Sequence, residues 1–206
     1  MPFPPASLVV FALIVSCLTS GWPRALADEL PADTNQIESL TPEAARKLAG
    51  EFPGVEVEVV VPRGTFPLPD CLPLNGLKAL DAETAKALAG YGRGPLLLNG
   101  LTTLDAATAT ALVAIKNWNG QLPAFTAFDT PDSVAIAEAL ATRQGKLTFP
   151  NLQKISPKTL TALLTKNDVE IPLVETLEVI PEPDGSLTED FLVPDWLEER
   201  QMQQAR

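Results

Sequence analysis

Apolar and polar positions recur in the same order along residues 72–121. The segment LPLNGLKALDAETAKALAG begins at Leu72, and LLLNGLTTLDAATATALVA begins at Leu96, 24 residues later. Each copy opens with Leu-x-Leu-Asn-Gly-Leu-x-x-Leu-Asp and continues into an alanine-rich segment. Closely spaced leucines, an Asn-Gly turn and a longer alanine-rich run are typical of a strand, a turn and a helix. The sequence therefore predicts that one such unit is repeated.

The same unit, with substitutions, extends over residues 37–180. Predicted strands start at Leu72, Leu96, Leu122, Leu147 and Ile171. Residues able to cap a helix N-terminus recur at Thr41, Asp81, Asp105, Thr130 and Ser156. Helices are therefore expected to begin near residues 42, 82, 106, 131 and 157. Because both signals share a period of 24–26 residues, the sequence predicts a repeat architecture of about six coils.

Residues 55–71 depart from this unit. VEVEVVV, at 55–61, is β-branched and partly alternating, which predicts a strand. The following segment, 62–71, contains three prolines in ten residues and cannot form a regular helix. This stretch is therefore expected to be a coil in which an extended loop replaces the helix.

Residues 1–27 have the features of a secretory signal peptide. Residues 8–18 form an apolar run too short to span a bilayer, and Ala25-Leu26-Ala27 places small residues before a cleavage site. A second interpretation rests on Ile14-Val15-Ser16-Cys17, which resembles the lipobox of bacterial lipoproteins and would be lipidated at Cys17. Both interpretations predict export to the periplasm, the cell envelope or the medium, with no transmembrane helix in the mature chain.

Polar segments flank the repeats. Residues 28–36 are expected to be a flexible linker. Residues 181–206 are expected to form an acidic linker and a C-terminal helix or cap. Between them, residues 37–180 form the predicted repeat domain.

Composition removes several classes of function. The sequence has no histidine, which excludes Ser–His and Cys–His catalysis and histidine metal ligands. The net charge is −11, and without Arg24 of the expected signal peptide it becomes 14 − 26 = −12, which disfavours nucleic-acid binding. Neither a metal site nor a cofactor is expected, and Cys71 is expected to be a small buried residue.

Carboxylates are the remaining candidates for catalysis. Glu189–Asp190 and Glu198–Glu199 are consecutive pairs near the C-terminus. Adjacent positions of a helix do not face each other, so neither pair forms an acid/base dyad. The chain is therefore not expected to be an enzyme, with a carboxylate-based enzyme as the less favoured alternative.

The repeated Leu-x-Leu-x-x-Leu-x-x-Leu pattern resembles the leucine-rich-repeat family, and most of all the short, alanine-rich repeats of secreted bacterial proteins. The resemblance implies an α/β fold: a right-handed leucine-rich-repeat-like solenoid, with a short curved parallel sheet and helices on the outer face. It also implies a core that is apolar, formed by Leu74, Leu77, Leu80, Leu88, Leu98, Leu101, Leu104, Leu112, Leu152, Ile155 and Leu163. Two departures are evident. The family's asparagine ladder falls at Leu77, Leu101 and Leu152, and Pro73, Pro123 and Pro172 remove strand donors.

The predicted function is that of an exported, non-enzymatic repeat protein, acting as a protein-interaction or structural module of a bacterial envelope. The alternative is a lipoprotein anchored through Cys17 with the same repeat domain. A protein partner is expected to bind one outward row on the sheet face and its strand ends, formed by Pro73, Asn75, Leu97, Asn99, Pro123, Thr148 and Pro172. In the alternative arrangement, the tail around Phe191 and Trp196 covers this row.

Overall fold

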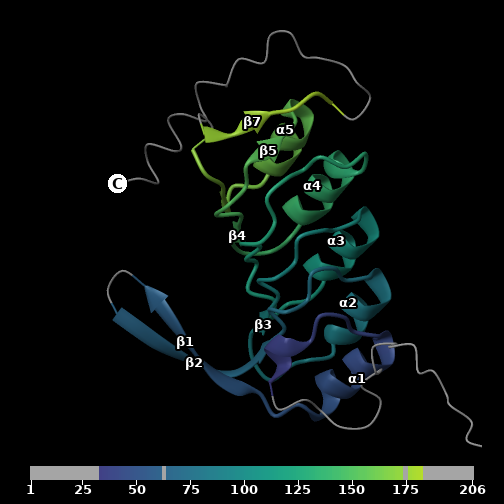
Figure 1. Ribbon diagram of the computed structural model, residues 1–206, viewed down its shortest axis with the longest axis vertical. Coiled ribbons are helices and arrows are strands. Elements are labelled where there is room, and N and C mark those ends of the chain that lie inside the picture. The colour runs from purple at the N-terminus through teal and green to yellow at the C-terminus, as the bar shows by residue number, and fades with distance from the viewer. Residues whose placement is uncertain (1–32, 62–63, 174–175, 183–206) are drawn as a thin grey trace, which may run out of the picture.

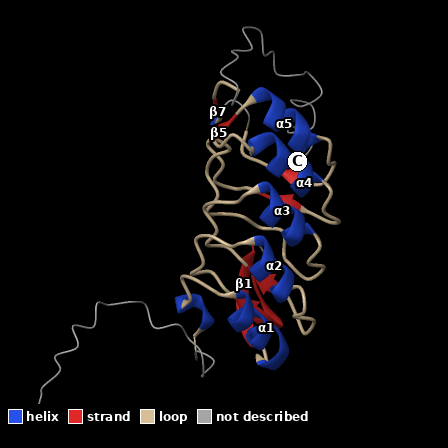
Figure 2. Ribbon diagram, turned by 90° about the vertical axis from the view of Figure 1, so that its right-hand side faces the viewer, coloured by secondary structure: helices blue, strands red, loops and turns tan. Residues whose placement is uncertain are grey.

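The computed structural model describes residues 33–61, 64–173 and 176–182. Within them the chain forms five α-helices: α1 (Pro42–Glu51), α2 (Ala82–Leu88), α3 (Ala106–Val113), α4 (Ser133–Ala141) and α5 (Pro157–Leu164). Each helix packs against the next in chain order, so the helices form a stack (Figure 1). The helices lie along one side of the molecule (Figure 1), and the view onto that side shows α1 to α5 stacked in chain order (Figure 2). None of the helices described is long and apolar enough to cross a membrane.

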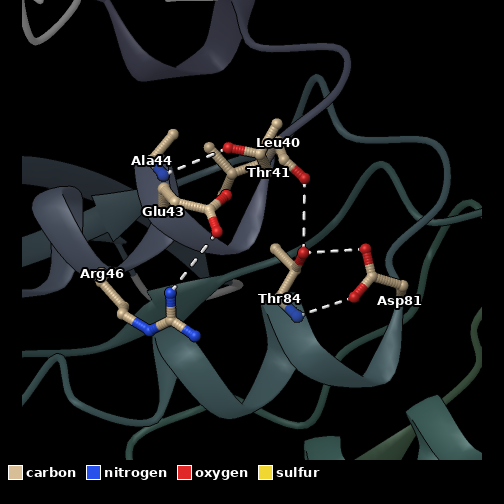
Figure 3. Close-up of polar contacts among 7 residues, drawn as sticks. All are labelled: Leu40, Thr41, Glu43, Ala44, Arg46, Asp81 and Thr84. Carbon is tan, nitrogen blue, oxygen red and sulfur yellow. Dashed lines mark hydrogen bonds and ion pairs between the residues drawn. The ribbon is translucent and has the colours of Figure 1, made fainter. Parts of the chain in front are cut away.

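Side chains cap the first two helices as the sequence predicts (Figure 3). Thr41 Oγ1 accepts the backbone N–H of Ala44 at 3.3 Å at the start of α1. At the start of α2, the Asp81 carboxylate accepts the N–H and the hydroxyl of Thr84, both at 2.8 Å. The Thr84 hydroxyl also lies 3.4 Å from the carbonyl oxygen of Leu40, which joins the start of α2 to the turn before α1.

The caps of α3 and α5 are likewise confirmed, but the cap predicted for α4 is wrong. Asp105 and Ser156 accept the N–H groups three residues ahead, at 2.6 and 3.4 Å. The helix expected near residue 131 instead begins at Ser133, and its N-cap residue Asp132 makes no side-chain capping bond. The Thr130 carbonyl accepts the Ser133 N–H at 3.1 Å, so residues 130–133 form a turn before α4 starts.

The strands of the described residues form three small sheets. β1 (Val55–Val61) pairs antiparallel with β2 (Gly64–Pro73), and the last two residues of β2 pair parallel with β3 (Leu96–Leu97). The other two sheets are two-residue parallel pairs: β4 (Leu147–Thr148) with β6 (Val169–Glu170), and β5 (Lys154–Ile155) with β7 (Glu178–Val179). Three isolated parallel bridges complete the described pairing, at Leu96–Trp118, Gln121–Thr148 and Ala127–Lys154.

This topology overturns the expected fold class. A right-handed leucine-rich-repeat-like solenoid requires one curved parallel sheet, whereas the described residues form separate sheets of two or three strands in a mixed α/β fold. The largest sheet contains an antiparallel pair, which a parallel sheet excludes. No continuous sheet forms because a strand of the repeat has two paired residues before its turn begins. Neighbouring segments are therefore joined by two-residue strand pairs or by single bridges.

The predicted core is confirmed. None of the eleven apolar residues assigned to it is more than 8% exposed. Aromatic rings extend this core where the repeats are less regular: the rings of Phe125 and Phe128 meet edge to face at 4.8 Å, and Phe149 packs against both. Successive layers of leucine and phenylalanine therefore hold the helices against the loops, without a continuous sheet.

Stacked turns join the first layers. Asn75 Nδ2 donates to Asn35 Oδ1 at 2.8 Å, and Asn75 Oδ1 accepts the Asn99 N–H at 3.1 Å. A Cβ on Gly76 would lie 2.3 Å from the Asn35 carbonyl oxygen, and one on Gly100 would lie 1.9 Å from that of Asn75. The Asn-Gly pairs thus supply an amide that links adjacent turns and a glycine that allows their backbones to touch.

The N-terminal turn of this stack comes from the segment expected to be a linker. Residues 34–36 form a 3-10 helix, η1 (Thr34–Gln36), with Thr34 buried. The Thr34 hydroxyl donates to the carbonyl of Pro73. Residues 33–36 of the predicted linker 28–36 therefore belong to the fold. Residues 1–27, with Cys17, lie outside the described residues, as do Phe191 and Trp196.

Candidate functional site: the projecting hairpin

Among the described residues, the β1–β2 hairpin is the one paired element that leaves the stack of helices. Figure 1 shows it projecting from the end of the molecule that holds α1 and α2. Val61 pairs with Gly64 around a two-residue connection, and Val55 pairs with Cys71 at the base. The segment 62–71, expected to be an extended loop, is therefore largely a strand. The alternate spacing of Pro67 and Pro69, typical of an edge strand, is the sequence signal that could have revealed it.

An irregularity at the base turns the hairpin away from the stack. The register shifts between Val55 and Val57, and Asp70 adopts a positive φ of 55° opposite this shift. Gly54, with φ 87°, allows the chain to pass Asp70, since a Cβ there would lie 2.5 Å from the Asp70 Cα. An extra residue of this kind bends a strand and increases its twist, which is why β2 leaves the sheet it shares with β3.

Contacts from the next repeat fix this bend. The buried Tyr91 hydroxyl donates to the Asp70 carbonyl. Burial, and to a smaller extent Asp70, raises the pKa of Tyr91, so the phenol stays a donor at neutral pH. Asn117 Nδ2 donates to the carbonyls of Tyr91 and Gly94, both at 2.6 Å, and so holds the loop that carries Tyr91. The hairpin is thus clamped at its base.

Cys71 lies at this base and is fully buried, as expected. Its thiol lies 3.3 Å from the Leu68 carbonyl oxygen. Burial, and to a smaller extent the negative charge of Asp70, raises the pKa of Cys71. A thiol whose pKa is raised and which is shielded from solvent is a poor nucleophile. Cys71 therefore fills space at the hairpin base.

The hairpin presents apolar and acidic side chains to solvent. Phe66 is 57% exposed and Val55 is 38% exposed, and these are two of the four large hydrophobic residues exposed among the described residues. Glu56 and Glu58 are also exposed on β1. Neither Phe66 nor Val55 belongs to the core that holds the helices together. Because Phe66 pairs with Val59, its side chain lies on the face of the hairpin opposite that of Glu56 and Glu58. An element that exposes apolar and acidic groups can contact a partner with apolar and basic groups.

The structure places the predicted binding row differently. Pro73 and Leu97 are paired in the β2–β3 register and both are buried. η1 packs against β2, and its Thr34 hydroxyl donates to the Pro73 carbonyl. Asn75 and Asn99 are half-buried and adjacent, joined through the stacked turns. The three other members of the row are also half-buried: Pro123, Thr148 and Pro172. The row is therefore not the open apolar strip that the sequence predicts.

A buried carboxylate lies at the other end of the molecule. Glu182 is 3% exposed; its Oε1 accepts the Lys158 N–H at 2.8 Å and its Oε2 accepts the Ser156 hydroxyl at 3.1 Å. A carboxylate at a helix N-terminus accepts hydrogen bonds from the unpaired N–H groups there and interacts favourably with the positive end of the helix dipole. Glu182 therefore attaches the chain after β7 to the start of α5. Sequence analysis missed it because it placed this residue in the acidic linker 181–206.

A half-buried cation, Arg143, closes the turn after α4. The Arg143 guanidinium lies 5.1 Å from the centre of the Trp118 ring and donates to the carbonyls of Lys146, Gln144 and Trp118. Burial lowers the pKa of Arg143. Since its charge is directed to backbone acceptors and an aromatic face, this cluster stabilises the loop.

No group of three or more Cys, Asp or Glu side chains in the described part of the chain is placed to hold a metal ion. The carboxylate pairs Glu189–Asp190 and Glu198–Glu199 lie outside the described residues.

Comparisons of the chain with protein-family models, curated proteins and solved structures give no match. The resemblance to the leucine-rich-repeat family therefore stays a prediction, and the functional argument rests on the chain's own residues.

Proposed function

We propose that this protein is an exported, non-enzymatic interaction module of a bacterial envelope, and that it binds a partner protein through the β1–β2 hairpin. The observation that carries the proposal is the exposure of Phe66 and Val55 on an element that projects from the core. Leaving a phenylalanine ring in water forgoes about 1.5–3 kcal/mol of burial free energy, which a partner can recover.

The construction of the hairpin base supports this role. Gly54, Asp70, Tyr91 and Asn117 hold the hairpin at a set angle. A binding element fixed in advance loses less conformational entropy when a partner docks. Phe66 and Val55 do not belong to the core cluster, so these two side chains have no packing role in the stack of helices.

Site-directed photo-crosslinking in the producing cell tests the proposal. A benzophenone side chain at position 66 is expected to give a discrete crosslinked product. The matched control carries the same group at Glu138, which is exposed on the outer face of α4. Crosslinking at Glu138 with none at Phe66 would move the binding surface to the helices and refute the hairpin proposal.

Export rests on the N-terminal segment. Intact-mass measurement of the exported protein is expected to show Asp28 as its first residue. Metabolic labelling with palmitate that is lost in Cys17→Ser would instead establish the lipoprotein alternative. A protein recovered uncleaved and in the cytoplasm would contradict both.

A further inference from the structure

The two long edges of the hairpin differ in their hydrogen-bonding groups. Proline has no N–H, so Pro67, opposite Glu58, belongs to a pair that exchanges no hydrogen bonds across the ladder. Pairs without hydrogen bonds alternate with hydrogen-bonded pairs along antiparallel strands. The pair Val61–Gly64 lies three positions from Glu58–Pro67, so it is a hydrogen-bonded pair. This agrees with the two-residue connection, which a hydrogen-bonded pair usually closes. The backbone nitrogens at positions 65, 67 and 69 of β2 therefore face away from β1.

Prolines block the outer edge of β2. Two of its three outward positions, Pro67 and Pro69, have no N–H to offer a further strand. Proline at such positions is a common device by which an edge strand avoids pairing with another chain. The β2 edge is thus protected along the part that extends beyond β3.

The outer edge of β1 has no such protection. β1 is the outermost strand in the sheet order β1-β2-β3, and 55–61 contains no proline. By the same alternation, the N–H groups of Glu56, Glu58 and Val60 face outward, and no described strand pairs with them. An unpaired strand edge of this kind can accept an added strand.

The side chains on β1 indicate the chemistry of that strand. Glu56 and Glu58 are two positions apart, so they lie on one face of the sheet, about 7 Å from each other. Both are exposed and neither forms an ion pair with a described residue. A strand with lysine or arginine at alternate positions would place its cations opposite these carboxylates. A second copy of this acidic chain would bring like charges together, with a net charge of −11 on each copy.

We propose that the outer edge of β1 binds an extended, basic segment of the partner protein by strand addition. Backbone hydrogen bonds to the β1 edge supply the pairing, and Glu56 and Glu58 select lysine or arginine at alternate positions. This inference rests on the proposed function of the hairpin and adds the class of partner to it.

A direct test uses the full chain and a soluble eight-residue peptide that alternates lysine with threonine. We expect binding that is measurable by fluorescence anisotropy at low ionic strength. We also expect slowed amide exchange at Glu56, Glu58 and Val60. The same peptide with glutamate in place of lysine is expected to bind at least tenfold more weakly. A peptide N-methylated at the amides that face β1 is expected to show the same loss.

Two variants separate edge pairing from charge. Glu58→Pro removes one outward N–H and a charge, whereas Glu58→Gln removes the charge alone. We therefore expect Glu58→Pro to weaken binding at least threefold more than Glu58→Gln. Thr65→Pro changes an outward N–H on the β2 edge and is the matched control, with unchanged affinity expected.

Three results would overturn the inference. One is equal binding of the N-methylated and unmodified peptides, which would show that charge alone attracts the peptide. A second is a dimer of the protein in sedimentation equilibrium that Glu58→Pro abolishes, which would make a second copy the occupant. The third is absence of peptide binding while crosslinking at Phe66 still captures a partner, which would leave the proposed function intact. If crosslinking at Phe66 also fails, the proposed function fails with it.

Discussion

Replacing Gly100 with alanine tests how closely the repeated turns approach each other. A Cβ at this position would lie 1.9 Å from the Asn75 carbonyl oxygen and 2.8 Å from that of Leu77, whereas real Cβ atoms essentially never come within 3.0 Å of another heavy atom. The Asn75 carbonyl would have to move by about 1 Å, and it belongs to the backbone, so no rotamer change relieves the contact. The turns containing Asn75 and Asn99 would be forced apart.

The expected change in the free energy of unfolding is the sum of three contributions. Overpacking of a well-packed region typically costs about 1–3 kcal/mol. Separation of the turns also weakens the hydrogen bond from the Asn99 N–H to Asn75 Oδ1, worth about 1 kcal/mol. Alanine restricts the unfolded chain and returns about 0.4–1 kcal/mol. Gly100→Ala is therefore expected to lower the free energy of unfolding by about 1–3.5 kcal/mol.

Urea denaturation followed by circular dichroism measures this change. Gly92→Ala is the matched control, because a Cβ there would meet no atom within 4 Å, and its stability is expected to equal or slightly exceed that of the unsubstituted protein. Gly50→Ala, inside α1 and equally open, should gain about 0.5–1 kcal/mol. Wild-type stability in Gly100→Ala, to within about 0.5 kcal/mol, would refute the close stacking of these turns.

Three further predictions concern the core, a helix cap and the hairpin base. Leu101→Asp puts an unpaired charge at a fully buried position and is expected to cost several kcal/mol or prevent folding, whereas Thr102→Asp, at an exposed neighbour, should leave the urea midpoint nearly unchanged. The hydrogen bond from the Thr84 N–H, and to a smaller extent the one from its hydroxyl, lowers the pKa of Asp81. The ionised carboxylate therefore stabilises the folded protein above about pH 4, and this stabilisation is lost as the pH falls through the lowered pKa. The stability difference between the unsubstituted protein and Asp81→Asn should therefore shrink between about pH 6 and about pH 3, and a constant difference in urea titrations would contradict this assignment. Tyr91→Phe deletes the donor to the Asp70 carbonyl and is expected to speed amide exchange in β1 and β2 with little change in α3; uniform exchange across all of these elements would show that Tyr91 does not hold the hairpin base.

The helices and the core could be predicted because their signals are local. A cap needs a side chain and an N–H three residues away, so Thr41, Asp81, Asp105 and Ser156 could be identified from the sequence. The buried leucines follow from their spacing within one unit. The prediction failed at Thr130 because a turn competed with the helix for the backbone groups of Ser133.

What only the tertiary structure decided is how distant segments meet. Strand pairing depends on the position of a partner many residues away, and two paired residues per strand are too few for one sheet to form. The burial of Pro73 depends on Thr34, 39 residues away, and that of Glu182 depends on Ser156, 26 residues away. No local pattern marks either contact, because each is formed when the stack of helices brings two polar groups together. The bend at Asp70 has the same origin: the chain tolerates a left-handed residue there because Tyr91, from the next repeat, holds its carbonyl.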